Sequence, residues 1–456
     1  MLTSQISRRQ LLLASGLALA GSRSRVWAQA APQGNNSVGR LIVVMLRGAY
    51  DGLSTFVPYA DPDYYASRPN IAIAAPDGTA KTALKLDSTF ALHPALAPML
   101  PLWQQGVLSF VPSAGLPTPN RSHFAAQYEM EIAQSGKTSA APGWLNKVAG
   151  SNKTITAAIG VDQRSATAIG VGEANPAILA GDVQVKLIQR GQAAQRTGVL
   201  ANDKTRQALM DLYAGNDKLS EAFRQGAGSR MQSAQELSNE KMEMDGKRMG
   251  PAMDKRLDNS LDKDGTPVSA QAQNAQMLAA SNGASDPVGL QLDAQHLGTL
   301  MRNDRNLRLG FLSAGGWDTH ANQGNATGQL ANNLGNLGRA IAQLRQDFSE
   351  PGDVVVVMSE FGRTAVENGT RGTDHGWGNA MWLVGNRVNG GKWHGQWTGL
   401  VRGNLNEARD LPAHHDYRAV LAQVMRSTLG MSDSALASVL PGSKWDARLD
   451  GLMRKT

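Results

Sequence analysis

The segment from Leu307 to Met358 constrains the fold more than any other part of the sequence. It contains two short apolar runs, 307–314 and 354–358, and the second is the uncharged, β-branched kind that forms strands buried on both faces. Between the runs, apolar residues recur at spacings of four and three, which predicts one face of a helix: Leu330, Leu334, Leu337, Ile341, Leu344 and Phe348. This strand–helix–strand order predicts an α/β fold, a doubly wound, mostly parallel sheet between helices.

Other parts of the chain fit the same architecture. Leu41–Met45 is another buried-strand run, and the 49 glycines among 456 residues suit many tight loops between strands and helices. We therefore expect residues 38–456 to form a single α/β domain. Residues 225–285 are rich in Gln, Asn, Ser, Ala and Met, which predicts a helical and flexible insert within that domain.

Two assignments rest on local pattern alone. The β-branched residues of Thr154–Val161 predict a strand. The segment Thr205–Arg224 predicts one amphipathic helix whose core face carries Leu209, Leu212, Leu219 and Phe223.

The first thirty residues have the features of an export signal. Arg8 and Arg9 stand directly before an apolar stretch that is too short to span a bilayer, and Ala28-Gln29-Ala30 fits a cleavage site. Residues 1–30 therefore resemble a twin-arginine signal peptide, with a Sec signal as the alternative. We expect the twin-arginine translocase as a partner during export, and a bacterial protein that is periplasmic or secreted and has no stable membrane insertion.

Charge and cysteine content exclude several classes of function. The formal charge of +7 includes four arginines within the first thirty residues, which contain no acid, so about +3 belongs to the rest of the chain. We therefore expect no nucleic-acid partner. The chain has no cysteine, which excludes disulfides, thiolate zinc sites, iron–sulfur clusters and type-1 copper.

Acids and histidines gather where predicted strands end. They follow the runs 41–45, 307–314 and 354–358 or precede the run 381–385, and they are Asp51, Asp318, His320, Glu360, Asp374 and His375. Because ligands bind at the carboxyl ends of strands in open α/β sheets, we expect these side chains to meet at one edge. Without thiolates, carboxylates and imidazoles suit a divalent metal such as zinc or manganese. The pattern predicts a site for one or two ions.

A hydroxyl and several arginines complete this predicted site. Ser122 precedes a predicted helix, and a helix N-terminus favours an anion and a deprotonated nucleophile. The alternative is that Ser122 is only an N-cap. Arg47, Arg121 and Arg363 are candidates to hold the anion by bidentate contacts.

Taken together, these motifs resemble a known family. They are the signal peptide, Asp51-Gly52-Leu53-Ser54, Arg121-Ser122-His123-Phe124, Gly316-Trp317-Asp318-Thr319-His320, and Ser359-Glu360-Phe361-Gly362-Arg363-Thr364 with Gly372-Thr373-Asp374-His375-Gly376. The chain is similar to an exported bacterial family of unknown function that is related to the alkaline phosphatase and sulfatase superfamily. The resemblance spans nearly the whole mature chain and implies an alkaline phosphatase-like fold.

The resemblance also implies roles for single residues. Ser122 matches the nucleophile, with Thr118 as a rival. Asp51 and Glu360 would hold one metal ion, and the other would be held by Asp318, His320 and His375. The superfamily has Asp-His or Asp-Asn where this chain has Glu360-Phe361, so one ligand is missing, and the second ion would be weakly bound, held by Asp374, or absent.

The function implied is that of a periplasmic metal-dependent hydrolase that acts on small anionic esters. Phosphate esters are the first choice and sulfate esters the second, because the formylglycine motif of ordinary sulfatases is absent from a chain without cysteine. The alternative is a non-catalytic exported binding or assembly protein that keeps the fold with an eroded site. Phe361 and the insert favour this alternative, whereas Asp318, His320 and His375 favour the enzyme.

Overall fold

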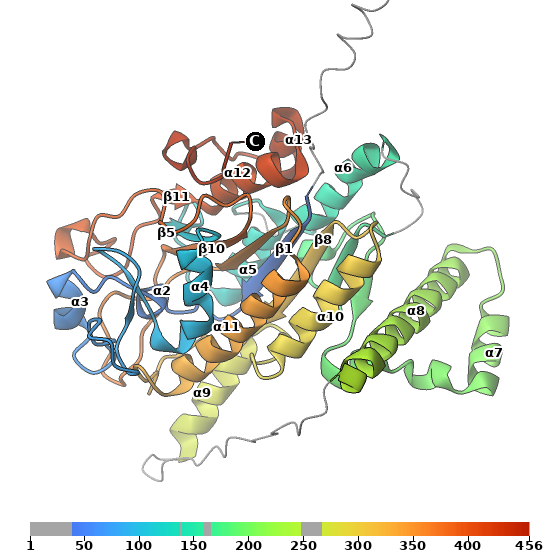
Figure 1. Cartoon of the computed structure of the whole chain (residues 1–456), viewed down its shortest axis with the longest axis horizontal. Coiled ribbons are helices and arrows are strands. Elements are labelled where there is room, and N and C mark those ends of the chain that lie inside the picture. The colour runs from blue at the N-terminus through green and yellow to red at the C-terminus, as the bar shows by residue number, and fades with distance from the viewer. Residues whose placement is uncertain (1–38, 137–138, 159–165, 248–266, 456) are drawn as a thin grey trace, which may run out of the picture. The chain divides into compact units, whose positions relative to one another are not determined.

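A computed structural model describes residues 39–136, 139–158, 166–247 and 267–455 (Figure 1). The predicted signal peptide, residues 1–30, and residues 248–266 of the predicted insert lie outside the described residues. Within the described part, no helix is both long enough and apolar enough to cross a membrane.

The centre of the described chain is an eight-stranded sheet in the order β11-β5-β10-β9-β1-β8-β6-β7. Its strands are β1 (Leu41–Leu46), β5 (Leu108–Gly115), β6 (Ala168–Val171), β7 (Lys186–Ile188), β8 (Leu309–Ala314), β9 (Val354–Ser359), β10 (Asn379–Gly385) and β11 (His415–Asp416). The pairs are parallel except the two that β10 makes with β9 and β5. The mostly parallel α/β sheet expected from the strand–helix–strand pattern is therefore confirmed.

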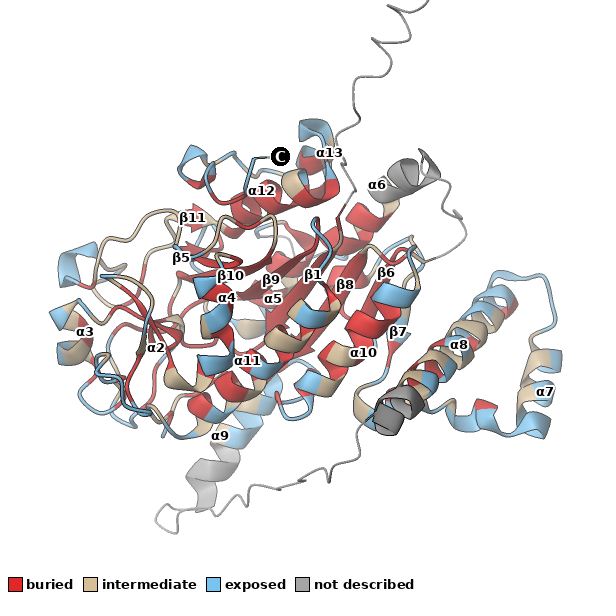
Figure 2. Cartoon of the chain, viewed as in Figure 1, coloured by how far each residue is buried: buried red, intermediate tan, exposed pale blue. Residues whose placement is uncertain are grey.

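Helices cover both faces of this sheet (Figures 1 and 2). Alternate residues of β1 explain why: Leu41, Val43 and Met45 pack into one hydrophobic cluster, and the residues between them pack into the other. The first cluster includes residues of α5 (His123–Ile132), α6 (Trp144–Ala158), α12 (Tyr417–Leu429) and α13 (Asp433–Val439). The second includes residues of η1 (Pro94–Met99), α4 (Leu100–Gln104), α10 (Leu290–Asn303) and α11 (Gln329–Asp347).

The helix predicted from the leucine repeat is α11, which joins β8 to β9. Its repeat residues are buried, so that prediction is confirmed. The strand predicted at Thr154–Val161 is wrong over residues 154–158, which continue α6, and residues 159–161 lie outside the described residues. Buried Trp144, Leu145 and Val148 give α6 its contact with the core, and this packing outweighs the strand propensity of the residues that follow.

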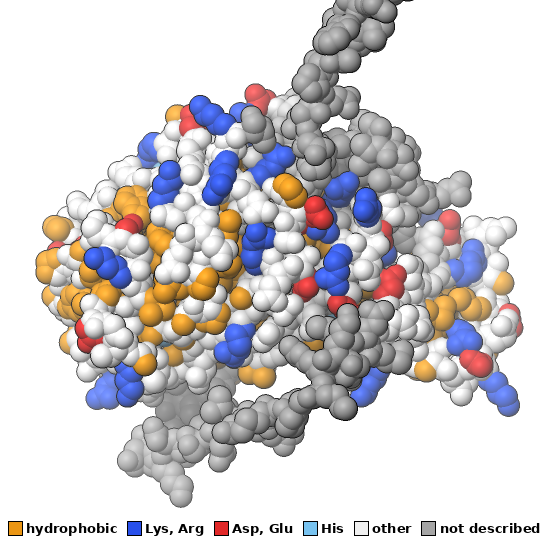
Figure 3. Space-filling model, in the orientation of Figure 1, with side chains coloured by type: hydrophobic (Ala, Val, Ile, Leu, Met, Phe, Trp, Pro, Cys, Tyr) orange, Lys and Arg blue, Asp and Glu red, His pale blue; other side chains and the backbone are white. Residues whose placement is uncertain are grey.

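Smaller elements surround the sheet. A second sheet contains β2 (Phe56–Val57), β4 (Ala91–Leu92) and β3 (Leu84–Lys85), and short helices are α2 (Gly52–Thr55), α3 (Pro62–Ser67), η2 (Ala177–Leu179), η3 (Gly191–Gln195), η4 (Gly198–Ala201), η5 (Arg402–Asn404) and η6 (Ala447–Leu449). On the face drawn in Figure 3, basic side chains are interspersed with acidic and apolar ones.

The segment around the predicted insert is helical where it is described. It contains α7 (Asp203–Leu212), α8 (Lys218–Lys247) and α9 (Pro267–Ala280). The single helix predicted over 205–224 is wrong, because a turn separates α7 from α8. Leu212 and Leu219 are 72% and 68% exposed, so they are not core residues as predicted. A break in the helix removes the common face that their spacing would have given them.

The sheet brings the ends of three parallel strands to one level. Leu46, the last residue of β1, pairs with Ala314 at the end of β8 and with Ser359 at the end of β9. The antiparallel strand β10 begins near this edge, because its Asn379 pairs with Ala114 close to the end of β5. Loops that follow β1, β5, β8 and β9 and precede β10 therefore emerge at the same edge.

His93 caps η1, and its hydrogen bonds fix its neutral tautomer. Its Nδ1 accepts a hydrogen bond from the Ala95 N–H at 3.0 Å, so its Nε2 carries the proton that faces the Asn325 carbonyl at 2.9 Å. Burial lowers the pKa of His93 from 6.5 to about 4. The folded state therefore binds the second proton, which charges the ring, less well than the unfolded state does. The free energy of unfolding consequently falls as the pH falls from about 6.5 to about 4.

We expect His93→Asn to flatten this part of the pH dependence. The asparagine oxygen keeps the capping acceptor but does not titrate, whereas the histidine costs up to about 3 kcal/mol on acidification. The free energy of unfolding, measured by denaturant titration at pH 7 and pH 4.5, should fall more steeply in the wild type than in the variant. Parallel losses in both proteins would contradict this role for His93.

Candidate metal centre

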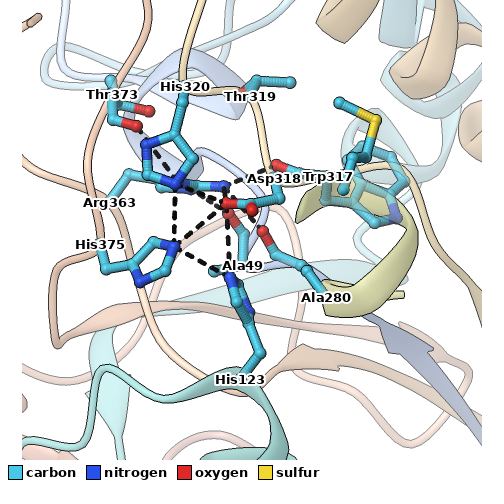
Figure 4. Close-up of polar contacts among 12 residues, drawn as sticks. Ala49, His123, Ala280, Trp317, Asp318, Thr319, His320, Arg363, Thr373 and His375 are labelled. Carbon is cyan, nitrogen blue, oxygen red and sulfur yellow. Dashed lines mark hydrogen bonds and ion pairs between the residues drawn. The ribbon is translucent and has the colours of Figure 1, made fainter. Parts of the chain in front are cut away.

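Three imidazoles converge on one carboxylate oxygen at the sheet edge (Figure 4). The Nε2 atoms of His320, His375 and His123 lie 3.0, 3.1 and 3.4 Å from Asp318 Oδ1. The Nε2 of His375 also lies 2.9 Å from that of His123 and 3.0 Å from that of His320. Ligand atoms of His123, Asp318 and His375 all lie within 4.8 Å of one another, as residues that share a metal ion do.

The fold delivers these side chains from three loops. His123 is the first residue of α5, which follows β5; Asp318 and His320 follow β8; and His375 precedes β10. Glycine allows two of these loops to touch, because a Cβ on Gly372 would lie 2.4 Å from the carbonyl carbon of His320. The site therefore depends on the alignment of strand ends in the sheet.

Each imidazole has an acceptor behind it. The Nδ1 of His123 lies 2.7 Å from Glu360 Oε1, that of His375 lies 2.9 Å from the Arg121 carbonyl, and that of His320 lies 3.2 Å from Asp374 Oδ1. Carboxylates and carbonyls only accept, so each Nδ1 carries a proton, and any ring that is neutral directs its Nε2 lone pair inward. Acceptors behind metal-binding histidines fix the tautomer in this way.

The inward-facing Nε2 atoms suit a cation. Among the described residues, no hydrogen bond brings a donor other than an imidazole to these three nitrogens. With neutral imidazoles, the carboxylates of Asp318, Glu360 and Asp374 and the Arg363 guanidinium give the cluster a charge of about −2, which a divalent ion would neutralise. The residues present therefore fit a metal ion of the kind that histidine and aspartate bind.

A proton competes for the same place. Burial lowers the pKa of His123, but the carboxylates of Asp318 and Glu360 outweigh burial and raise it to about 9. For His375, burial dominates and lowers the pKa. Burial disfavours the Asp318 carboxylate, yet the three imidazoles and Arg363 hold the pKa of Asp318 well below its usual range. The cluster therefore keeps an anionic centre and attracts one positive charge.

Arg363 is committed to the protein itself. Its Nη2 lies 2.5 Å from Asp318 Oδ1, and its other contacts are the carbonyls of Gly48, Ala49, Trp317 and Thr373. The side chain is fully buried. Arg363 therefore orients Asp318 and ties the loops after β1, β8 and β9 together.

Glu360 lies behind His123 and is fully buried. Its Oε1 accepts from the Gly48 N–H at 2.7 Å and from Gln127 Nε2 at 2.9 Å, in addition to His123, and its Oε2 accepts from Ser359 Oγ. Burial raises the pKa of Glu360, but the hydrogen bond from His123 outweighs it and the pKa is lowered. The structure thus places Glu360 behind His123, where it orients the imidazole.

Asp51 lies in a different buried network. Its carboxylate pairs with Arg68 at 2.6 Å and accepts from Gln323 at 2.7 Å and Ser54 at 2.8 Å, and it caps α2. Burial raises the pKa of Asp51, but Arg68 outweighs burial and the pKa is lowered.

Phe361 packs its ring against two imidazoles of the cluster. Its ring centroid lies 4.8 Å from that of His123 and 5.0 Å from that of His375.

The predicted nucleophile and anion-binding residues lie nearer the surface. Ser122 is exposed and caps α5 by position, but its side chain makes no capping hydrogen bond within the described residues. Thr118 is also exposed. Arg121 is 30% exposed and contacts Glu407 at 2.8 Å and Asp410 at 3.0 Å. Arg47 is buried between Glu131 and Glu173.

Sequence reasoning missed His123, which belongs to the cluster that could hold a metal ion. It was part of the motif that singled out Ser122, and it lies past the end of a strand like the other members of the cluster. Extending the strand-end criterion to every histidine would have included it. Asp374 was found, and it serves as the acceptor behind His320.

Comparison with known proteins gives a family but no activity. No curated protein matches the chain. Residues 38–439 match the model of a protein family of unknown function, DUF1501, and because this match covers most of the sequence, the chain belongs to that family.

Proposed function

We propose that this protein is a metal-dependent hydrolase of phosphate esters, with sulfate esters as the second choice. One divalent ion, zinc or manganese, would be held by His123, Asp318, His320 and His375. The observation that carries the proposal is the convergence of three Nε2 atoms on Asp318 Oδ1, each ring fixed from behind by an acceptor. This is the donor set of a catalytic or binding metal site without thiolates.

The side chains suit ester hydrolysis in distinct ways. When bound, a divalent ion polarises an ester oxygen and stabilises developing negative charge. His320 and His375 are 28% and 23% exposed, so the cluster is open to a small ligand on their side. Ser122 stands at the N-terminus of the ten-residue helix α5, where backbone N–H groups and the helix dipole favour a deprotonated oxygen.

Arg121 is the arginine best placed to hold the substrate anion. Its guanidinium pairs with Glu407, whose side chain is 59% exposed, and such surface ion pairs contribute little stability. A phosphate group can therefore compete with Glu407 for this guanidinium, which also pairs with Asp410 at 3.0 Å. Arg47 and Arg363 are buried and fully engaged with protein groups, so we assign them structural roles.

The location follows from the N-terminal sequence. We propose that the mature protein is periplasmic or secreted. It would reach its compartment through the twin-arginine translocase, which would recognise the paired arginines of the signal peptide. That pathway carries folded proteins, which suits a site that takes up its metal before export.

A non-catalytic binding or assembly role is the second candidate. The observation that favours it is the engagement of Asp51 by Arg68, because the second metal position implied by the superfamily resemblance is thereby occupied by a guanidinium. A single metal site with an aromatic ring packed beside it would also suit reversible ligand binding.

Turnover of metal-loaded protein tests the enzyme directly. We expect hydrolysis of p-nitrophenyl phosphate or of the corresponding diester, and we expect Ser122→Ala to reduce turnover at least about 1000-fold because the attacking oxygen is removed. The matched control Thr118→Ala should retain turnover. Full activity of Ser122→Ala would assign the attack to Thr118 or to water. A wild type that holds its metal but cleaves neither phosphate nor sulfate esters would favour the binding protein.

A further inference from the structure

Gln127 shares a helix face with His123. The two residues are four apart on α5, a spacing that places side chains one above the other. Both donate to the same atom, Glu360 Oε1, at distances of 2.7 Å from His123 Nδ1 and 2.9 Å from Gln127 Nε2. The metal centre is therefore backed by a carboxylate that is held from two points of one helix.

The orientation of the Gln127 amide is determined by its partners. Its Nε2 donates to Glu360 and also to the Ala280 carbonyl at 2.7 Å, and its Oε1 accepts from Arg47 Nη1 at 3.0 Å. Arginine only donates, and carboxylates and carbonyls only accept, so a flipped amide would oppose all three partners. The side chain is fully buried and uses both of its N–H donors and its oxygen.

Arg47 fixes the far end of this arrangement. Its guanidinium is buried and forms ion pairs with Glu131 at 2.8 Å and Glu173 at 2.7 Å. A continuous chain of hydrogen bonds thus runs from Glu173 through Arg47 and Gln127 to Glu360 and ends on His123. Buried polar networks of this kind rigidify the groups they contain when every member is satisfied.

We propose that Gln127 is a positioning residue of the metal centre. It holds Glu360 where the carboxylate accepts the Nδ1 proton of His123, and it thereby keeps the His123 Nε2 lone pair directed at the ion. This role rests on the metal centre of the proposed function and is independent of the reaction catalysed. Groups that orient a metal-binding histidine typically contribute about 10- to 100-fold to metal affinity.

The test is zinc affinity by competition with a chromophoric chelator. Gln127→Met keeps the side-chain volume but removes both donors, and we expect it to weaken zinc binding about 10-fold. Gln127→Glu places a carboxylate oxygen against Glu360 and should weaken binding further. Asn146→Leu is the matched control, because Asn146 is another buried amide that donates to two carbonyls, those of Leu179 and Val183. It should leave zinc affinity unchanged.

A double-mutant cycle separates positioning from general destabilisation. If Gln127 acts through Glu360, adding Gln127→Met to Glu360→Gln should cause no further loss of affinity. The absorption spectrum of the cobalt-substituted protein should shift in both Gln127 variants and remain that of the wild type in Asn146→Leu. Two Gln127 variants with different chemistry guard against a folding defect in one of them, and circular dichroism establishes that each is folded.

The outcomes are distinct. Wild-type protein that takes up neither zinc nor cobalt would overturn the metal centre and the positioning role together. The role of Gln127 alone would be overturned if the wild type binds zinc and both Gln127→Met and Gln127→Glu bind it with wild-type affinity and show the wild-type cobalt spectrum. Additive losses in the cycle would show that Gln127 acts independently of Glu360, which also contradicts the proposal.

Discussion

Replacing His375 with alanine will weaken metal binding at least about 100-fold, because it removes one of the four proposed ligands and the other three cannot close the gap. The Nε2 of His375 lies within 3.1 Å of three other atoms of the cluster, those of Asp318, His123 and His320, so it is the most central of the imidazoles. Metal content after dialysis, measured by elemental analysis, checks this result.

The control for His375 is another histidine of the same chain. The Nε2–H of His394 donates to the Asn389 carbonyl at 2.8 Å, and the side chain lies outside the cluster. We expect His394→Ala to keep the metal content of the wild type. Equal retention of metal by the two variants would show that His375 is not a ligand.

Replacing Asp51 with asparagine will destabilise the fold by about 3–5 kcal/mol and leave the metal content unchanged. The substitution leaves the guanidinium of Arg68 buried without its counter-charge, although Thr364 and Ala365 carbonyls still accept from it. Denaturant titration gives the free energy of unfolding, and elemental analysis of the same samples gives the metal content. The two readouts distinguish a structural carboxylate from a ligand.

Asp61→Asn is the matched control for this experiment. Asp61 also caps a short helix, α3, and among the described residues its Oδ1 accepts from the Asp63 N–H and its Oδ2 from the Leu400 N–H. An asparagine keeps one of these acceptors and leaves no buried guanidinium without its counter-charge. We expect a change within about 1 kcal/mol. Loss of metal from Asp51→Asn with unchanged stability would instead place Asp51 among the ligands.

Uninterrupted apolar runs and one helical repeat carried most of the fold prediction. Buried parallel strands are continuous apolar runs, and Leu41–Met45 and Val354–Met358 stand out because no polar residue interrupts them. The repeat of α11 is equally plain because one face of that helix is buried along its length. Thr154–Ala158 was assigned wrongly because local propensity cannot register the packing of the preceding turns of α6.

The position of the site was predictable, but the roles of its members were not. The aligned strand ends bring Asp318, His320, Glu360 and His375 to one edge, as the polar residues after each apolar run suggested. Asp318 faces the Nε2 atoms of the imidazoles, whereas Glu360 stands behind His123. The two positions differ by about the length of one side chain, a difference that a sequence pattern does not specify. The partner of Asp51, Arg68, is 17 residues away in a segment with no motif, so sequence patterns did not reveal it.

Metal content per chain tests the central claim most directly. Mature protein purified without chelator, and the same protein offered zinc or manganese and then dialysed, should contain about one ion per chain, held by the four converging side chains. Two ions would show that a second site forms despite the Asp51–Arg68 pair. A folded protein that contains no ion and takes up none would contradict the metal centre and the hydrolase built on it.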